Sequence, residues 1–430
     1  MAKIQAIRGT KDILPDELQY WDFVHNKISS LLECANYQEI RTPIFENSDL
    51  YDRGIGRDTD IVNKEMYRFH DRSNRDITLR PEGTAGIVRA FIENKMSYHN
   101  SMQRLWYSGP MFRYERPQSG RQRQFHQLGI EFIGSPDARA DSEVIHLAMS
   151  IFNNLNLTEL KLDLNSIGTV QDRSIYQAKL QDYLKQYYDD LDSDSQRRLI
   201  SNPIRILDSK NTNTQKILSD APTISDFLSF ESKKHFDNVC NYLGLLDIPY
   251  NVNDKLVRGL DYYNDTAFEI KTLTSEGQDT VCGGGRYDSL INQLGGTETP
   301  AVGCAIGLER LLLLAKEKIE LPNKYIDFYI ATQGEKANEA GIKIMRFLHQ
   351  QLFKIEIDVS SNNFGKQIKQ ANRKRATACI ILGNKEVEQG LISIKWMSTQ
   401  QQENMTSMQF EQSISYLKKK LLFYKSNNSY

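Results

Sequence analysis

Residues 104–134, RLWYSGPMFRYERPQSGRQRQFHQLGIEFIG, hold five arginines and only two acidic residues. The flanking runs RLWYSGPMFRYE and FHQLGIEFIG alternate in polarity and contain aromatic and β-branched residues, which predicts two strands. The RPQSGRQRQ segment between them has the Pro, Ser and Gly that are typical of a hairpin connection. The sequence therefore predicts an antiparallel hairpin with an arginine-rich loop.

Arg113 falls on the first predicted strand, so its side chain should project from a sheet face among apolar neighbours. Removing a charge from water is costly unless the charge is paired. We therefore expect Glu115, Glu131 or a bound anion to pair with this guanidinium. A salt-bridged hairpin is the simpler interpretation of this segment alone, and the rest of the chain must decide between the two.

Length and composition predict a globular protein of two or three domains. The chain has 430 residues, of which 40% are hydrophobic and 25% charged. Its net charge of -1 argues against binding nucleic acid over the whole surface but permits local basic patches. The five cysteines are dispersed and show no zinc spacing, which is typical of reduced intracellular thiols, and the seven histidines show no metal-ligand spacing either. The most apolar stretch, at 301–315, is too short to span a membrane.

The chain changes character twice. Residues 165–250 are rich in Asp, Lys, Gln, Ser and Leu and lack glycine-centred motifs, which favours a helical insertion. A linker-like break, LPNK, occurs at 321–324. From residue 325, strand and helix patterns alternate over the remaining chain. That rhythm predicts a compact α/β domain on a parallel or mixed sheet.

Charged groups are combined with glycines in four segments: TLRPEGT (78–84), the hairpin, LVRGLDYYN (256–264) with GGGRYD (283–288), and GLERLLLL (307–314). Arginines that converge from several strands suit a polyphosphate, because the guanidinium binds phosphate oxygens in pairs. The chain has no G-x-x-x-x-G-K-[ST] motif and no G-x-G-x-x-G that opens a helix. The motifs therefore predict a phosphate site made of arginines on an antiparallel sheet.

Taken in order, these motifs resemble those of the histidyl-tRNA synthetase family of class II aminoacyl-tRNA synthetases. Residues 41–56, RTPIFENSDLYDRGIG, resemble the first class motif, which forms the dimer interface of the family. Residues 112–134 resemble the second motif, and AVGCAIGLERLLLL (301–314) resembles the third. LVRGLDYYN and GGGRYD are similar to two segments peculiar to the histidine enzymes, and the resemblance covers nearly the whole chain.

The resemblance implies an α+β protein with two domains. Residues 1–322 would form the class II synthetase catalytic domain on an antiparallel sheet, with the helical insertion at about 165–250. Residues 325–430 would form a C-terminal α/β anticodon-binding domain. It further implies a homodimer in the cytoplasm, or in an organelle stroma or matrix if the gene is organellar.

The implied reaction joins L-histidine to ATP, giving histidyl-adenylate and pyrophosphate, and then moves histidine to the 3′ end of tRNA(His). Mg2+ is expected with ATP, without a fixed protein metal site. The alternative is a non-synthetase paralogue that acts as the regulatory subunit of ATP phosphoribosyltransferase. Such chains generally lack the C-terminal domain and lose signature residues, whereas Glu82, Arg113, Arg258 and Arg310 are present here.

Matching positions imply the roles of individual residues. The catalytic candidates, two of which would flank the α-phosphate, are Arg113, Arg258 and Gln127. The candidates for binding ATP are Arg113, Glu115, Arg121 and Arg310. The candidates for binding histidine are Glu82, Thr84, Gln127, Glu131, Arg258, Tyr262, Tyr263 and Tyr287. Glu131 and Tyr263 match the positions that face the two imidazole nitrogens.

Two segments carry the expected tRNA contacts. RPQSGR in the hairpin loop resembles the loop that meets the acceptor end, with Arg116 and Gln118 as candidates. FGKQIKQANRKRA (364–376) has five basic residues and no acid, and contributes Lys366 and Lys369. Without the resemblance, a solvated helix face would explain these lysines, and core packing would explain the three tyrosines.

Overall fold

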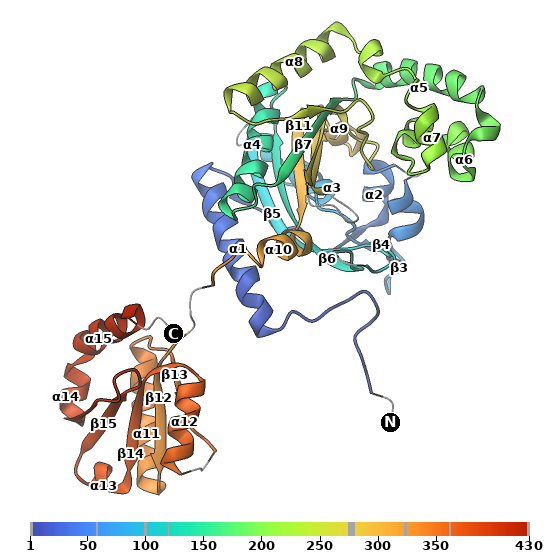
Figure 1. The fold of residues 1–430 in the computed structure, drawn as a ribbon. Coiled ribbons are helices and arrows are strands. Elements are labelled where there is room, and N and C mark those ends of the chain that lie inside the picture. Colours follow the sequence, from blue (N-terminus) through green and yellow to red (C-terminus); the bar gives the residue numbers. More distant parts are fainter. Residues whose placement is uncertain are drawn as a thin grey trace. The chain divides into compact units, whose positions relative to one another are not determined.

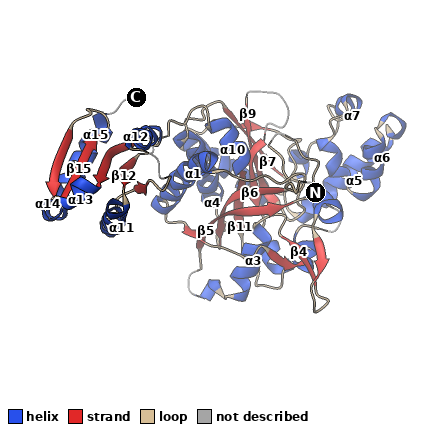
Figure 2. Cartoon of the chain, turned by 90° about the horizontal axis from the view of Figure 1, so that it is seen from below, coloured by secondary structure: helices blue, strands red, loops and turns tan. Residues whose placement is uncertain are grey.

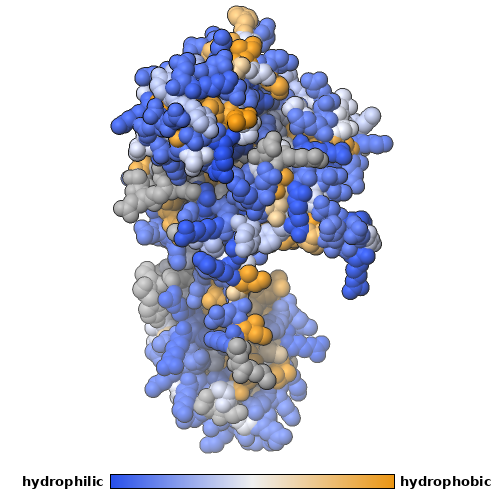
Figure 3. Space-filling view, turned by 90° about the vertical axis from the view of Figure 1, so that its right-hand side faces the viewer, coloured by the Kyte–Doolittle hydropathy of each residue, from blue (hydrophilic) through white to orange (hydrophobic). Residues whose placement is uncertain are grey.

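The computed structural model describes residues 3–56, 59–98, 101–118, 120–273, 280–321, 325–360 and 363–427. The chain forms two compact units, Met1–Leu321 and Pro322–Tyr430 (Figure 1). On the face drawn in Figure 3, hydrophilic side chains dominate and apolar side chains gather in small patches. Among the described helices, none combines the length and apolar character that crossing a membrane requires.

The first unit is built on an eight-stranded sheet with the order β1-β5-β6-β11-β10-β9-β7-β8. Its strands are β1 Gln38–Glu39, β5 Gln103–Phe112, β6 Gln124–Ile133, β7 Leu160–Ser166, β8 Asn251–Val252, β9 Asn264–Thr272, β10 Thr280–Arg286 and β11 Ala301–Gly307. The central pairs are antiparallel, as predicted, whereas the edge pairs β1–β5 and β7–β8 are parallel.

The predicted hairpin is confirmed as β5 and β6, which pair from Gln103 opposite Ile133 to Phe112 opposite Gln124. The expectation that Arg113 lies on the strand is wrong by one residue, because β5 ends at Phe112. The Arg113 N–H still donates to the Arg123 carbonyl at 2.9 Å, but the next N–H turns to Glu65. Arg113 therefore stands where the ladder opens into the loop.

Helices cover both faces of this sheet (Figure 2). Because side chains alternate along a strand, Trp106 of β5 joins one core and its neighbours Leu105 and Tyr107 join the other. The first core includes residues of α1 Pro15–Cys34, α4 Ala138–Asn154, α8 Phe230–Leu245 and α10 Leu308–Ala315. The second includes residues of α2 Ser48–Gly54, α3 Thr84–Glu93 and α9 Leu290–Gln293.

A small antiparallel sheet lies beside the second core, with the order β2-β4-β3. Its strands are β2 Phe45–Asn47, β3 Arg68–His70 and β4 Asp76–Leu79, and the short helical turns nearby are η1 Ile61–Glu65 and η2 Met96–Tyr98. TLRPEGT runs from the end of β4 into the first residue of α3, so this motif connects a strand to a helix N-terminus.

The helical insertion has a hydrophobic core of its own, which includes Tyr176, Leu180 and Leu199. Its elements are α5 Val170–Lys185, η3 Tyr188–Asp190, α6 Ser193–Ser201, η4 Pro203–Asp208, α7 Thr212–Ile217 and η5 Ile224–Phe227. The following helix, α8, instead buries Val239 and Leu243 in the core of the main sheet. The self-contained helical part therefore spans about residues 170–227.

The second unit is an α/β domain on a mixed five-stranded sheet with the order β13-β12-β14-β15-β16. Its strands are β12 Ile326–Gln333, β13 Ile355–Ile357, β14 Ala376–Gly383, β15 Leu391–Trp396 and β16 Gln402–Thr406. The first three strands are parallel, and the last two pair antiparallel. Its helices are α11 Glu335–Gln350, α12 Phe364–Arg373, α13 Asn384–Glu388, α14 Ser407–Gln412 and α15 Ile414–Asn427.

Candidate active site

A pocket of about 760 Å³ in the first unit brings most of the predicted site residues together. Its lining includes Glu82, Thr84, Arg113, Glu115, Arg121, Gln127, Arg258, Tyr262, Tyr263 and Arg310. They come from the α3 N-terminus, the β5–β6 hairpin, the loop before β9 and the start of α10. The volume is in the range of small-molecule sites.

Glu82 lies at the N-terminus of α3 and is 4% exposed. Its carboxylate accepts the backbone N–H groups of Thr84 at 2.6 Å and Ala85 at 2.9 Å. The first N–H groups of a helix lack intrahelical partners and carry partial positive charge, so they hold a carboxylate well. Burial raises the pKa of Glu82, and these two hydrogen bonds oppose that rise.

Glu131 on β6 is 1% exposed and lies behind the pocket lining. It accepts hydrogen bonds from the hydroxyls of Thr84 at 2.8 Å and Tyr287 at 2.5 Å. Burial raises its pKa to about 8, although both hydrogen bonds act in the opposite direction. Gly303 faces it on β11, and a Cβ there would overlap the carboxylate. Glu131 is thus fixed from three sides.

Three tyrosines surround this buried corner. The ring centroids of Tyr262 and Tyr263 are 4.7 Å apart, and those of Tyr262 and Tyr287 are 5.7 Å apart. All three belong to the second hydrophobic core, but Tyr262 and Tyr263 also line the pocket. Tyr262 and Tyr263 therefore pack in the core and line the pocket at the same time.

Arg258 also lines the pocket, from the loop before β9. Its Nη1 donates to Glu269 of β9 at 2.6 Å, and its guanidinium is 5.6 Å from the centre of the Tyr263 ring. Gly283 of β10 lies against the guanidinium, where a Cβ would clash with it. Glu269 was not predicted, because it belongs to a strand without motif character and only the fold brings it to Arg258.

Glu115 stands between two arginines of the hairpin loop. Its carboxylate is 3.0 Å from Arg121 Nη1 and 4.0 Å from Arg113 Nη1, the outer limit of an ion pair. Arg113 Nε also donates to the Pro81 carbonyl at 2.8 Å. Of the two carboxylates expected to pair with Arg113, Glu115 does so, and Glu131 is turned to Thr84 and Tyr287 instead.

The second and third motifs meet at Glu309. Its carboxylate accepts the backbone N–H of His126 at 2.9 Å and contacts the His126 ring Nδ1 at 2.9 Å. The neighbouring Arg310 donates from Nη1 to the Thr280 carbonyl. The start of α10 is thereby attached to β6 and β10. Sequence reasoning missed Glu309 because its partner is far away in the chain.

The tRNA candidates lie outside the pocket lining. Arg116 and Gln118 are exposed in the hairpin loop, and Ser119 of the same segment lies outside the described residues. Lys366 and Lys369 of α12 line a separate hollow of about 490 Å³ in the second unit. Tyr329 also lines that hollow but is only 2% exposed.

Arginines from the β5–β6 hairpin and from the start of α10 meet at one pocket over an antiparallel sheet, which is the arrangement expected of a class II aminoacyl-tRNA synthetase. A family model described as histidyl-tRNA synthetase matches residues 9–311, and one described as an anticodon binding domain matches residues 327–420. The chain belongs to the histidyl-tRNA synthetase family.

Three relatives span nearly the whole chain. It is 82% identical over 430 residues to the chloroplastic histidine–tRNA ligase of Pyropia yezoensis, covering 100% of both chains. It is 54% identical over 426 residues to the histidine–tRNA ligase of Microcystis aeruginosa, covering 99% of this chain and 100% of the relative. The apo crystal structure of S. aureus histidyl-tRNA synthetase matches with a TM-score of 0.80 and 38% identity, covering 97% of this chain and 100% of that one. The regulatory-subunit alternative is therefore not favoured.

Proposed function

We propose that the pocket of the first unit activates L-histidine with ATP and transfers it to tRNA(His). The observation that carries this proposal is the meeting of LVRGLDYYN with the arginines of the second and third motifs around one pocket. The first segment belongs to the histidine-specific part of the resemblance, and the arginines suit a triphosphate. One cavity therefore offers partners for both reactants of adenylate formation.

The arginines hold ATP. Arg113 and Arg258 flank the α-phosphate, Arg121 and Arg310 bind the β- and γ-phosphates, and Glu115 faces the adenine or the ribose. The histidine carboxylate attacks the α-phosphorus, and the bond from that phosphorus to the bridging oxygen breaks to release pyrophosphate. Catalysis rests on positioning and on stabilising the charge that develops at the phosphate. In support, Arg113, Arg258 and Arg310 each keep a donor on a carbonyl or carboxylate that fixes the side chain.

The buried corner binds histidine. Glu82 and Thr84 contact the α-ammonium, and Gln127 contacts the carboxylate. Glu131 and Tyr263 face the imidazole, beside Tyr262 and Tyr287. A carboxyl whose pKa is about 8 keeps a proton at neutral pH, so it can donate as well as accept. A buried polar partner left without its hydrogen bond also penalises analogues that lack the ring nitrogens.

Magnesium ions accompany ATP in this proposal. Among the described residues, no group of three His, Cys, Asp or Glu side chains could hold a metal, so the phosphate oxygens would be the main ligands. Mg2+ bound in this way neutralises phosphate charge. The arginines of the pocket then orient the triphosphate.

The remaining proposals concern partners and place. Arg116 and Gln118 read the acceptor end of tRNA, where arginine suits guanine O6 and N7, and Lys366 and Lys369 bind the anticodon arm.

The dimer forms through the first-motif segment, whose small sheet exposes Phe45 and Phe69. By analogy with the chloroplastic relative, the protein acts in the chloroplast stroma, which organelle fractionation would test.

Pyrophosphate exchange tests the proposal. The purified protein should exchange pyrophosphate into ATP with histidine but with no other protein amino acid, and only when Mg2+ is present. It should also charge a tRNA(His) transcript, and gel filtration should give twice the chain mass. Folded, dimeric protein that gives no histidine-dependent exchange would contradict the proposal.

A further inference from the structure

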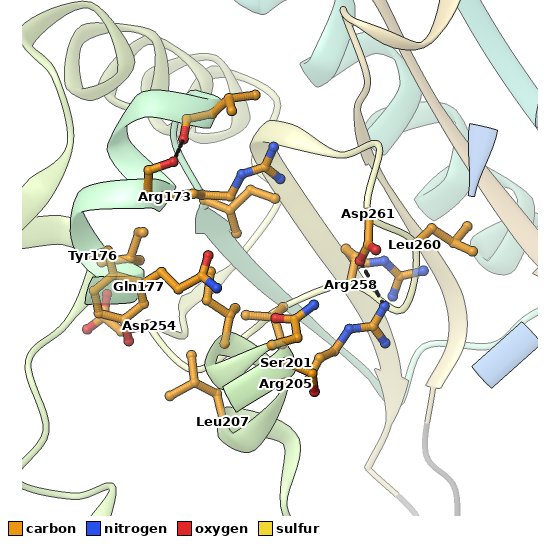
Figure 4. Close-up of a pocket in the computed structure, with 17 residues that line it drawn as sticks. Arg173, Tyr176, Gln177, Ser201, Arg205, Leu207, Asp254, Arg258, Leu260 and Asp261 are labelled. Atoms are coloured by element: carbon orange, nitrogen blue, oxygen red, sulfur yellow. Dashed lines mark hydrogen bonds and ion pairs between the residues drawn. The ribbon is translucent and has the colours of Figure 1, made fainter. Parts of the chain in front are cut away.

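The loop at 253–263 is a wall between two cavities. On one side is the reaction pocket, and on the other is a cavity of about 300 Å³ lined by the helical insertion and this loop (Figure 4). Arg258 and Leu260 line both cavities. The loop connects β8 to β9 and has no helix or strand of its own. Beside this cavity the loop packs on the insertion through Val257, which belongs to the hydrophobic core of the insertion.

Two arginines of the insertion hold this wall. Arg205 of η4 donates from Nη2 to the Gly259 carbonyl at 2.8 Å. The same nitrogen donates to Asp261 Oδ1 at 3.1 Å (Figure 4). Arg173 of α5 donates from Nη1 to the Tyr263 carbonyl. The two anchored carbonyls belong to the residue that follows Arg258 and to the tyrosine proposed to face the imidazole.

The main body holds the same loop at two further points. Asn165 of β7 donates to the Leu256 carbonyl at 3.0 Å, and the Asp261 N–H donates to the Ile55 carbonyl at 3.2 Å. The direction in which Arg258 points therefore depends on contacts from both the main body and the insertion. A guanidinium that binds two acceptors at once fixes their relative position as well as their distance.

We infer that Arg205 and Arg173 are positioning residues, through which the helical insertion sets the geometry of Arg258 and Tyr263 in the reaction pocket. This inference rests on the proposed function. A displacement of about 1 Å at a reacting group can cost on the order of 100-fold in rate. Loss of the anchors should therefore slow adenylate formation, although neither side chain reaches the substrates in this account.

Variants of Arg205 test the inference. Arg205→Ala should lower kcat for histidine-dependent exchange by about 10- to 100-fold and raise the KM for histidine, because the loop moves. Arg205→Lys keeps the positive charge and a single donor nitrogen, so it should recover part of the activity. Arg197→Ala is the matched control, since Arg197 lies on α6 of the same insertion and pairs with Asp194 at 2.6 Å. It should behave as wild type.

A second measurement separates positioning from general damage. Hydrogen exchange of the amides at 253–263 should be faster in Arg205→Ala than in wild type, with an unchanged melting temperature. In an Arg258→Ala background, Arg205→Ala should add little further loss, because it acts through Arg258. Should Arg205→Ala fail to fold, the lysine variant serves the same comparisons.

The outcomes are distinguishable. The inference would be overturned if the double variant lost the product of the two single-variant reductions in exchange rate. It would also be overturned if Arg205→Ala had the exchange kinetics and the amide protection of wild type. Wild-type protein without any histidine-dependent exchange would overturn the proposed function instead. The amide measurement would still report whether Arg205 holds the loop.

Discussion

The two ends of the reaction pocket are built differently. At the buried end, Glu82, Glu131 and Tyr287 are at most 4% exposed, and their polar atoms bind one another, Thr84 or a helix N-terminus. At the other end, the Arg121 side chain is 39% exposed and lies 3.0 Å from the Glu115 carboxylate. The buried end is shaped before any substrate arrives, whereas the arginine end keeps charge near solvent. Substitutions at the buried end should therefore change recognition, and those at the arginine end should change rate.

Arg258→Ala should have the largest effect and would break the arginine end. Single-turnover adenylate formation should fall by about 1,000-fold, because the charge acts mainly on the transition state. The melting temperature should change little, since Glu269 keeps Lys271 at 3.2 Å and Thr280 at 3.1 Å. A loss of only a few-fold in the adenylation rate would count against the proposed role.

Removal of the second unit should leave both ends of the pocket working. A chain that stops after Leu321 should form adenylate within about threefold of the intact rate, because the first unit has its own cores. Its kcat/KM for charging tRNA(His) should fall by roughly tenfold or more, since phosphate and base contacts are lost. Unchanged charging would show that Lys366 and Lys369 do not serve tRNA binding.

Glu131→Gln would alter the buried end without changing its volume much. One of the two hydroxyl donors, from Thr84 or Tyr287, would then face an amide NH2 group. Disturbing a buried hydrogen bond costs about 1–3 kcal/mol, so the KM for histidine should rise about 10- to 100-fold. The KM for ATP, measured in the same assay, is the internal control and should stay near its wild-type value. If the KM for histidine equalled the wild-type value, Glu131 would not contribute to the recognition of histidine.

The same variant should also change the pH dependence of stability. The pKa of Glu131 is raised from its ordinary 4.5 to about 8, so the folded state holds this proton more tightly than the unfolded state. The free energy of unfolding should therefore fall as pH rises between these two values, and Glu131→Gln should lack this loss. Melting curves should show the variant gaining on wild type from pH 5 to pH 8.5. If the difference in melting temperature between the variant and wild type were the same at every pH, burial would not raise the pKa of Glu131.

Local patterns in the sequence predict much of the fold and of the site. The hairpin, the start of α3 near Glu82 and the α/β rhythm of the second unit depend on nearby residues, and all are present. The pairings Arg258–Glu269 and His126–Glu309 depend on which strands become neighbours, and nothing local indicates them. The same holds for the anchors of the loop before β9, which join elements far apart in the chain.

The sequence also does not predict small differences in the position of a residue. Arg113 lies just beyond β5 because the ladder ends when the next N–H turns to Glu65, a contact between distant segments. Glu131 lies behind the pocket lining, where its carboxyl group accepts hydrogen bonds from Thr84, which lines the pocket, and from Tyr287, which does not. Alternation along a strand predicts the face of the sheet on which a side chain lies. How deeply that side chain is buried depends on the residues that pack against it.

Single-turnover adenylate formation, measured over a range of histidine concentrations at saturating ATP, tests the contrast between the two ends most directly. Wild type, Glu131→Gln and Arg258→Ala should be compared in one series. The account predicts that Glu131→Gln mainly raises the histidine concentration for half-maximal rate and that Arg258→Ala mainly lowers the maximal rate. Equal changes of the same parameter in both variants would contradict it.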